Sequence, residues 1–115
     1  MAITYSQYDN EIVVNDNKIV FDHNIRYVKE VNDILIVLLE IPNNVTYLNN
    51  VFGINKIGEI KWRIQSVSDV FPIKNQLPFE NLMVKDNDVY VSDFYGRRFS
   101  LNPSNGEVTS SDVVR

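Results

Sequence analysis

The sequence predicts an all-β protein, a small antiparallel sandwich or barrel, on three observations. Val and Ile together make up 28 of the 115 residues, and β-branched side chains suit pleated strands. Ala, the strongest helix former, occurs only once, as Ala2. Short apolar runs alternate with turns, which the 15 Asn residues favour because Asn tolerates a left-handed backbone. We expect one domain over residues 1–115, with about eight to ten short strands.

The N-terminal elements are predicted to be a hairpin over residues 11–21, in which two apolar runs flank a three-residue turn, Asn15-Asp16-Asn17. Apolar residues that largely alternate with polar ones indicate the next strand, over 25–31. Because each run is short and bounded by turn residues, both segments favour strands over helices.

An uninterrupted apolar run over residues 34–39 follows the turn residues Asn32 and Asp33. Apolar side chains on both faces of a strand indicate burial on both sides, so we expect this strand at the centre of the fold. A buried helix is the alternative, which the β-branched residues and the nearby Pro42 disfavour. A loop at Pro42 precedes a further strand extension over 45–48.

Strands are next expected over residues 51–54 and 59–64, on either side of a tight turn that ends at Gly58. The second of these strands has the clearest alternation in the chain. It predicts an inward face of Ile60, Trp62 and Ile64 and an outward face of Glu59, Lys61 and Arg63.

A long connection over residues 65–80 contains Pro72 and Pro78, with a helical turn expected near 66–70. The remaining strands are expected at 82–84, 89–91, 98–101 and 107–109, and the last turn contains Gly106.

Two parts of the chain are similar to each other. Residues 52–60 match residues 99–108 with one extra turn residue, which defines repeat unit one over 25–64 and repeat unit two over 81–113. Self-similarity at this spacing is typical of blade-type meanders. We therefore expect Gly58 and Gly106 to lie in equivalent hairpin turns.

These units resemble the blades of quinoprotein-type β-propellers. Residues 55–62, Asn-Lys-Ile-Gly-Glu-Ile-Lys-Trp, are similar to the tryptophan-docking pattern of that family, whereas unit two has Ser110 where the Trp would fall. The resemblance implies meander-like sheets. A closed propeller needs at least four blades of about 40 residues. The chain is therefore expected to form two meander-like sheets, packed as a sandwich or rolled into a small barrel, without a central channel, and no cofactor function carries over.

Composition and motifs exclude several classes of function. The chain has no Cys, and its net charge of −4 argues against a general nucleic-acid binder. No apolar segment is long enough for a membrane helix, and the start does not resemble a signal peptide, so we expect a cytoplasmic protein. His23, the single histidine, is a candidate general base or a surface turn residue. We expect no enzyme activity, no cofactor and no metal site.

The expected function is binding to another protein, and the expected partner is basic because the chain is acidic. An immunity-type inhibitor of a basic toxin is one protein of this kind, by analogy. A small-molecule-binding barrel or sandwich, with its pocket under residues 65–80, is the alternative. The oligomeric state stays open. The candidate binding residues combine carboxylates with loop aromatics and a neighbouring cation: Asp86, Asp88, Asp93, Phe94, Tyr95 and Arg97.

Overall fold

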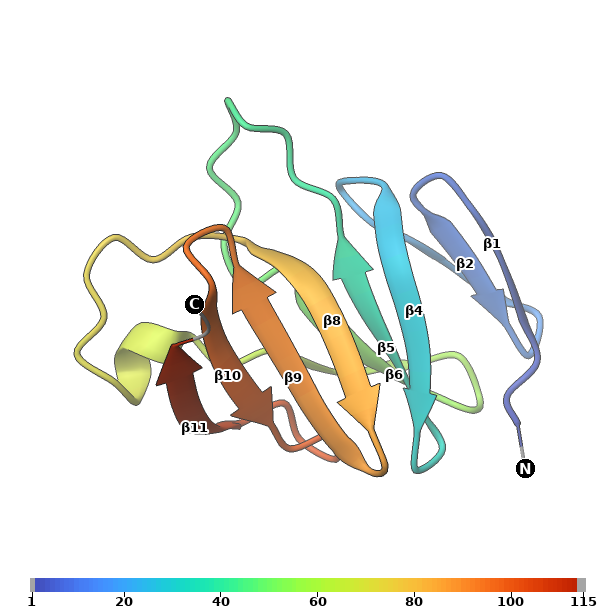
Figure 1. Cartoon of the computed structure of the whole chain (residues 1–115). Helices are drawn as coiled ribbons and strands as arrows, with labels where there is room; N and C mark the ends of the chain where they lie inside the picture. Colours follow the sequence, from blue (N-terminus) through green and yellow to red (C-terminus); the bar gives the residue numbers. More distant parts are fainter. Residues whose placement is uncertain (1, 114–115) are drawn as a thin grey trace.

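A computed structural model describes residues 2–113, in which eleven strands form three antiparallel sheets (Figure 1). The all-β class is therefore confirmed. The first sheet has the order β1-β2-β3, the middle sheet β4-β5-β6-β7 and the last sheet β11-β10-β9-β8. The bounds are β1 Tyr5–Tyr8, β2 Glu11–Val14, β3 Asn17–Val20, β4 Ile25–Val31, β5 Ile34–Leu39, β6 Val51–Asn55, β7 Ile60–Arg63, β8 Phe79–Lys85, β9 Asp88–Asp93, β10 Arg97–Leu101 and β11 Val108–Val113.

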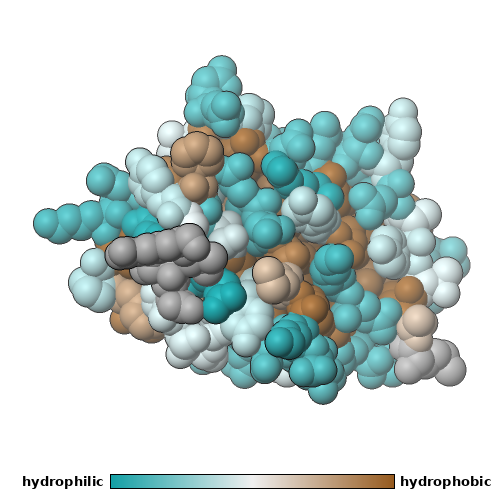
Figure 2. Space-filling model, in the orientation of Figure 1, coloured by the Kyte–Doolittle hydropathy of each residue, from teal (hydrophilic) through white to brown (hydrophobic). Residues whose placement is uncertain are grey.

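The three sheets lie in layers, with the middle sheet buried on both faces. Leu35 and Val37 of β5 pack with Ile12 of the first sheet, whereas Ile36 and Leu38 belong to the cluster shared with the last sheet. In the view of Figure 2, hydrophilic side chains cover most of the surface and hydrophobic ones show in small separate areas. None of the three sheets closes on itself. The sandwich and the central strand over 34–39 are thus confirmed, and the barrel alternative is wrong.

Several elements differ from the predicted ones. A strand, β1, precedes the predicted hairpin 11–21 and adds a third strand to it. The turn of that hairpin has two residues, Asn15 and Asp16, both with positive φ, because Asn17 already pairs with Val14. Residues 45–48 form no strand. The predicted connection ends earlier than residue 80, since β8 begins at Phe79 and pairs there with β9.

The predicted equivalence of two hairpins is confirmed by their turns. Asn55 ends β6 and Asn102 directly follows β10, and each side-chain Oδ1 accepts the backbone N–H two residues later. Gly58 and Gly106 then follow with φ of +87° and +76°, values that glycine adopts without steric cost. The helical turn expected in the connection is also present, as the 3₁₀ turn Val67–Asp69.

A hairpin with a two-residue turn recurs in all three sheets, as β2–β3, β4–β5 and β8–β9. Val14-Asn15-Asp16 in the first sheet matches Val31-Asn32-Asp33 in the middle sheet, and both turns have two residues at positive φ. The β8–β9 hairpin also turns over two residues. After β3 the chain passes into the middle sheet, so the first sheet has no counterparts of β6 and β7.

β-Bulges lie at matching places in the middle and last sheets. Arg26 and Glu80 are the extra residues near the starts of β4 and β8, and Lys61 and Thr109 are the extra residues of β7 and β11. A bulge interrupts the alternation of side chains. Ile60 is therefore 48 % exposed, and the prediction that it shares the inward face of Trp62 is wrong.

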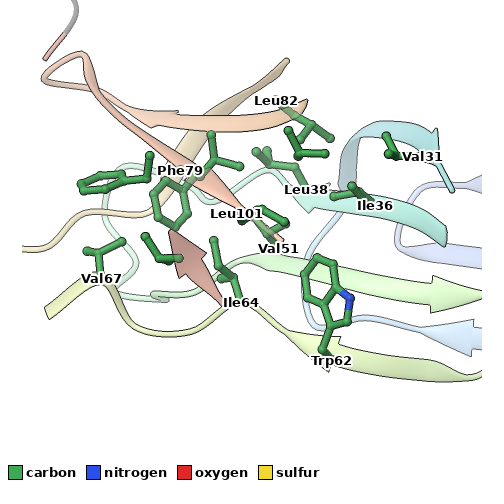
Figure 3. Close-up of a cluster of buried hydrophobic side chains, with 14 residues drawn as sticks. Val31, Ile36, Leu38, Val51, Trp62, Ile64, Val67, Phe79, Leu82 and Leu101 are labelled. Atoms are coloured by element: carbon green, nitrogen blue, oxygen red, sulfur yellow. The ribbon is translucent and has the colours of Figure 1, made fainter. Parts of the chain in front are cut away.

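Trp62 joins the middle sheet to the last one. Its ring lies against Gly53 and Gly106 so closely that a side chain at either glycine would overlap it. The indole N–H donates to the carbonyl of Pro103 at 2.8 Å, and Figure 3 shows the ring among the buried apolar side chains. Ser110 pairs with Ser100 in the last sheet as Trp62 pairs with Gly53 in the middle sheet. Ser110 therefore occupies the position in unit two that Trp62 occupies in unit one.

The last sheet ends the stack with a polar outer face. On the corresponding face of the middle sheet, apolar side chains contact the next sheet. The pairing of β9 with β10 can be aligned with that of β5 with β6. In this alignment the positions of Ile36, Leu38 and Val51 are occupied in the last sheet by Tyr90, Ser92 and Arg98. The Arg98 guanidinium lies over the Tyr90 ring, 5.1 Å from its centroid. A polar outer face is what keeps terminal repeats of stacked folds soluble.

The Asn50 side chain connects the middle sheet to the last sheet by hydrogen bonds to their backbones. Its side chain is fully buried, and its Nδ2 donates to the carbonyls of Leu39 and Phe79, at 2.8 Å each. Its Oδ1 accepts the N–H of Phe79 at 2.8 Å. One amide thus forms hydrogen bonds with three backbone groups, at the last residue of β5 and the first residue of β8. Buried polar groups need such partners, because an unpaired one is costly.

Within residues 2–113, no helical segment has the length and apolar character needed to cross a membrane.

We expect Trp62→Ala to lower the free energy of unfolding by about 3–5 kcal/mol, because a buried aromatic ring leaves a cavity and a lost hydrogen bond. Ile60→Ala, two residues away in the same strand, is expected to cost within about 1 kcal/mol. Urea unfolding followed by far-UV circular dichroism measures both, since Trp62 is the only tryptophan and its removal abolishes the fluorescence signal. Equal losses would contradict the burial of Trp62.

We expect Asn50→Asp to destabilise the fold in a pH-dependent way. An ionised carboxylate would still accept the Phe79 N–H but would repel two carbonyls, so burial raises the pKa of the introduced carboxyl in the folded state. Its stabilising protonated form is present at low pH, and that stability is lost as pH rises through the folded pKa. The urea midpoint should therefore fall between about pH 4 and pH 7, relative to wild type.

Asn49→Asp is the matched control for this variant. The Oδ1 of Asn49 only accepts a hydrogen bond, from Gln76 Nε2 at 2.8 Å, and a carboxylate keeps that function. A pH dependence of the same size in both variants would rule out the proposed role of the Asn50 amide.

Candidate functional site

The six predicted binding residues lie at the two ends of β9 rather than at one edge. Asp86 lies in the β8–β9 turn and Asp88 begins β9, whereas Asp93 ends it. A six-residue strand is about 17 Å long at ~3.4 Å per residue, and Figure 1 shows the two turns at opposite ends of the last sheet. The structure brings together Asp93, Phe94, Tyr95 and Arg97 and separates Asp86 and Asp88 from them.

Asp93 is a structural group of the β9–β10 turn. Its Oδ1 accepts the backbone N–H groups of Tyr95 and Arg97, at 3.0 and 3.1 Å. Its Oδ2 accepts Arg97 Nε at 2.8 Å in an ion pair, and the carboxylate side chain is 3 % exposed. The prediction that Asp93 presents its charge to a partner is therefore wrong, because the carboxylate is satisfied within the turn.

Arg97 ties this turn to the long connection. Its two terminal nitrogens donate to the carbonyls of Lys74 and Asn75, at 3.2 and 3.0 Å, while its Nε binds Asp93. The guanidinium also lies over the Tyr95 ring, 5.4 Å from the centroid. Arg97 thus fixes the position of the turn and of the chain opposite it.

Phe94 and Tyr95 form the tip of the same turn, and we call them the aromatic tip. They are 74 % and 64 % exposed, and their ring centroids are 6.2 Å apart. Contiguous exposed apolar surface marks interaction sites, and aromatic residues are enriched at interface hot spots. Among the four predicted residues that lie together, Phe94 and Tyr95 are the accessible ones.

A groove of about 470 Å³ lies beside the aromatic tip. Its walls are the β5–β6 loop over residues 40–48, the segment 76–80 before and at the start of β8, and the aromatic tip itself. Figure 1 shows the β5–β6 loop and the β9–β10 turn at the same end of the molecule. Most lining side chains are apolar, including Ile41, Pro42, Val45, Leu48, Leu77 and Pro78.

Three charged side chains line the groove: Arg26, Glu40 and Glu80. Arg26 Nη1 lies 4.0 Å from Glu40 Oε1. The pKa of Arg26 is raised above its usual value, first by its hydrogen bond with the Tyr27 side chain and also by the charges of Glu40 and Glu80. Both carboxylates thus act on one guanidinium, and the charged part of the groove has a net charge of −1.

The β5–β6 loop is anchored from the side away from the groove. Arg63 Nε and Nη2 donate to the carbonyls of Asn49 and Leu48, at 2.9 and 2.8 Å. The Arg63 guanidinium lies over the Tyr47 ring, 4.9 Å from its centroid, and His23 packs against that ring edge-on at 4.8 Å. The loop wall is therefore held in place by backbone hydrogen bonds and ring contacts.

The other candidates from the sequence lie away from the groove. His23 supports Tyr47 at its position next to β4. Asp86 and Asp88 are exposed at the far end of the last sheet, and no group of three or more Asp, Glu or His side chains within residues 2–113 is arranged to hold a metal ion. A second hollow of about 780 Å³ lies near the N-terminal segment, and Asp16 and Lys56 are among its lining residues.

Sequence reasoning missed the groove residues Glu40, Leu48, Leu77 and Glu80. A signal was present, because apolar Ile41, Val45 and Leu48 recur in a loop that also contains Pro and Asn. That signal shows that the loop covers or lines something, but it does not identify the opposite wall, which lies about 30 residues further along the chain.

We expect Asp93→Asn to lower the free energy of unfolding by about 1–3 kcal/mol, because it removes the buried charge that pairs with Arg97. Asp88→Asn changes the same charge at the exposed end of β9 and is expected to stay within about 0.5 kcal/mol of wild type. Urea unfolding monitored by tryptophan fluorescence measures both. Equal stabilities would show that the Asp93 carboxylate is dispensable for the turn.

Comparison with known proteins shows the family to which the chain belongs. No curated protein matches the chain. A family model described as "Domain of unknown function (DUF7957)" matches residues 2–113, and that range includes every strand of the three sheets. This description does not mention propeller blades, so the resemblance to quinoprotein-type repeats stays a prediction. Because the match covers nearly all of its length, the chain belongs to the family Domain of unknown function (DUF7957).

Proposed function

We propose that this chain acts by binding another protein, rather than by catalysis, through the aromatic tip and the groove beside it. The exposure of Phe94 and Tyr95, at 74 % and 64 %, is the observation that carries the proposal. Aromatic side chains provide large contact area with few rotatable bonds, so they lose little conformational entropy on binding.

The hydrogen bonding of the turn and loop supports this proposal. Asp93 holds the backbone of the β9–β10 turn, and Arg97 fixes the opposite segment at Lys74 and Asn75. Gln76 is tied on both sides, since its Nε2 donates to Asn49 and its Oε1 accepts Ser66 Oγ. A surface that is ordered before binding avoids part of the entropic cost of association.

The charge of the chain favours a basic partner. With 15 acidic and 11 basic side chains, the protein would attract a basic protein at long range and speed the encounter. An immunity-type inhibitor that neutralises a basic toxin in the cytoplasm is the form of this function that we favour. Asp86 and Asp88 would contribute to this long-range attraction only, because they lie at the other end of β9.

Binding of a small molecule is the second candidate, and the volume of the groove favours it. A groove of about 470 Å³ falls in the range of ~300–1,000 Å³ typical of ligand pockets. Such pockets are mostly apolar with a few polar groups that orient the ligand. The charged side chains beside the apolar lining, Arg26, Glu40 and Glu80, would have that role.

The experiment compares what the full-length chain captures from its source cells with and without the aromatic tip. We expect wild type to retain one protein in near-stoichiometric amount after cross-linking. The double variant Phe94→Ser/Tyr95→Ser should lose that protein while keeping its free energy of unfolding within about 0.5 kcal/mol, because both side chains are exposed. Mass spectrometry identifies the captured protein.

Tyr8→Ser/Val20→Ser is the matched control, since these side chains are 75 % and 58 % exposed on the first sheet. The control should capture the protein as wild type does. Capture that survives loss of the aromatic tip would refute the proposed site. A small molecule that copurifies with wild type and the control, but not with the double variant, would instead support the second candidate.

A further inference from the structure

The groove combines an apolar lining with two carboxylates and a single cation. Arg26 is paired with Glu40 at 4.0 Å, while none of the ion pairs found within residues 2–113 involves Glu80. Glu80 is exposed and lies among Leu77, Pro78 and the aromatic tip in the groove lining. The groove therefore offers an apolar surface that leads to a negative charge.

The two bulges explain why these charges face the groove. Arg26 and Glu80 are the extra residues of equivalent bulges at the starts of β4 and β8, and Figure 1 shows these two strands side by side. A bulge turns its extra residue out of the regular alternation of the sheet. The side chains of Arg26 and Glu80 thus lie outside the regular alternation of β4 and β8, and both line the groove.

The chemistry of this surface selects among occupants. A carboxylate-bearing segment would be repelled by Glu40 and Glu80, and a wholly apolar one would bury two carboxylates with one cation between them, which is costly. Lys and Arg side chains combine an aliphatic stem with a terminal cation. The stem fits an apolar lining such as Leu77, and the cation can interact with both a carboxylate and an aromatic ring.

We propose that the groove receives a lysine or arginine side chain from an extended segment of the protein partner. The stem packs against Leu77 and the aromatic tip, and the cation pairs with Glu80. This inference rests on the proposed function, since it specifies which chemical group of the partner the groove recognises. Charge complementarity supports it at two scales, the net charge of −1 among the groove side chains and the net charge of −4 of the chain.

The test is selection of a phage-displayed library of random peptides against the immobilised full-length chain. Parallel selections against Phe94→Ser/Tyr95→Ser remove peptides that bind elsewhere. We expect the remaining peptides to share one Lys or Arg next to an apolar or aromatic residue. The best peptide is then synthesised with its Lys or Arg, and again with Gln at that position.

Dissociation constants of the two peptides are measured on wild type, Glu80→Gln and the control Glu107→Gln, in which an exposed Glu of the β10–β11 turn loses the same charge. On wild type and on the control, the Gln peptide should bind about tenfold more weakly than the cationic one. On Glu80→Gln this difference should shrink to about twofold, because the charge that distinguishes the peptides has been removed.

Two negative results have different meanings. If the peptides that need the aromatic tip are acidic or uncharged, or if the tenfold difference persists on Glu80→Gln, the groove does not recognise a cation at Glu80, and protein binding at this site still stands. If no selected peptide depends on Phe94 and Tyr95, both the cation site and the proposed function fail.

Discussion

The buried amide of Asn50 is the contact on which the arrangement of this molecule depends. It satisfies backbone groups at the end of β5, where the chain enters the β5–β6 loop, and at the start of β8, where the chain enters the last sheet. Apolar packing between sheets is not directional and tolerates sliding. Three short hydrogen bonds to a fully buried side chain do not, because each group left unpaired costs about 1–3 kcal/mol. Asn50 therefore sets the relative position of the two sheets.

The same contact places the walls of the groove. Phe79, which Asn50 holds, begins β8 next to the segment 76–78, and Leu39 ends β5 just before the loop over residues 40–48. Because both ends are held by one amide, the loop and the connection must pass each other at this end of the sandwich. Arg63 and Arg97 then fix the two segments from opposite sides. The groove is a consequence of how the sheets are joined.

Repetition with small changes explains the rest of the architecture. Each of the three sheets contains the same two-residue hairpin, and the middle and last sheets share two bulges and a Gly-containing turn. The middle and last sheets differ in the side chains on one face. Trp62 packs on the β10–β11 turn of the last sheet and donates a hydrogen bond to Pro103 there. Ser110, at the equivalent position of the last sheet, is instead hydrogen-bonded to the Ser100 hydroxyl. The middle sheet thus has an apolar face where the last sheet has a polar one.

The sequence by itself determined the all-β class, the doubly buried strand over 34–39 and the equivalence of the hairpins at Gly58 and Gly106. These properties depend on composition, periodicity and turn chemistry, which are local. It also identified Phe94 and Tyr95 as loop aromatics. Only the tertiary structure decided that Ile60 faces away from Trp62. It also decided that the Asp93 carboxylate is hydrogen-bonded within the β9–β10 turn, whereas Asp86 lies at the opposite end of β9. It also decided that Glu40 and Glu80 share a groove. Bulges shift the alternation without a clear sequence signal, and a groove between distant segments exists only once long-range packing has brought them together.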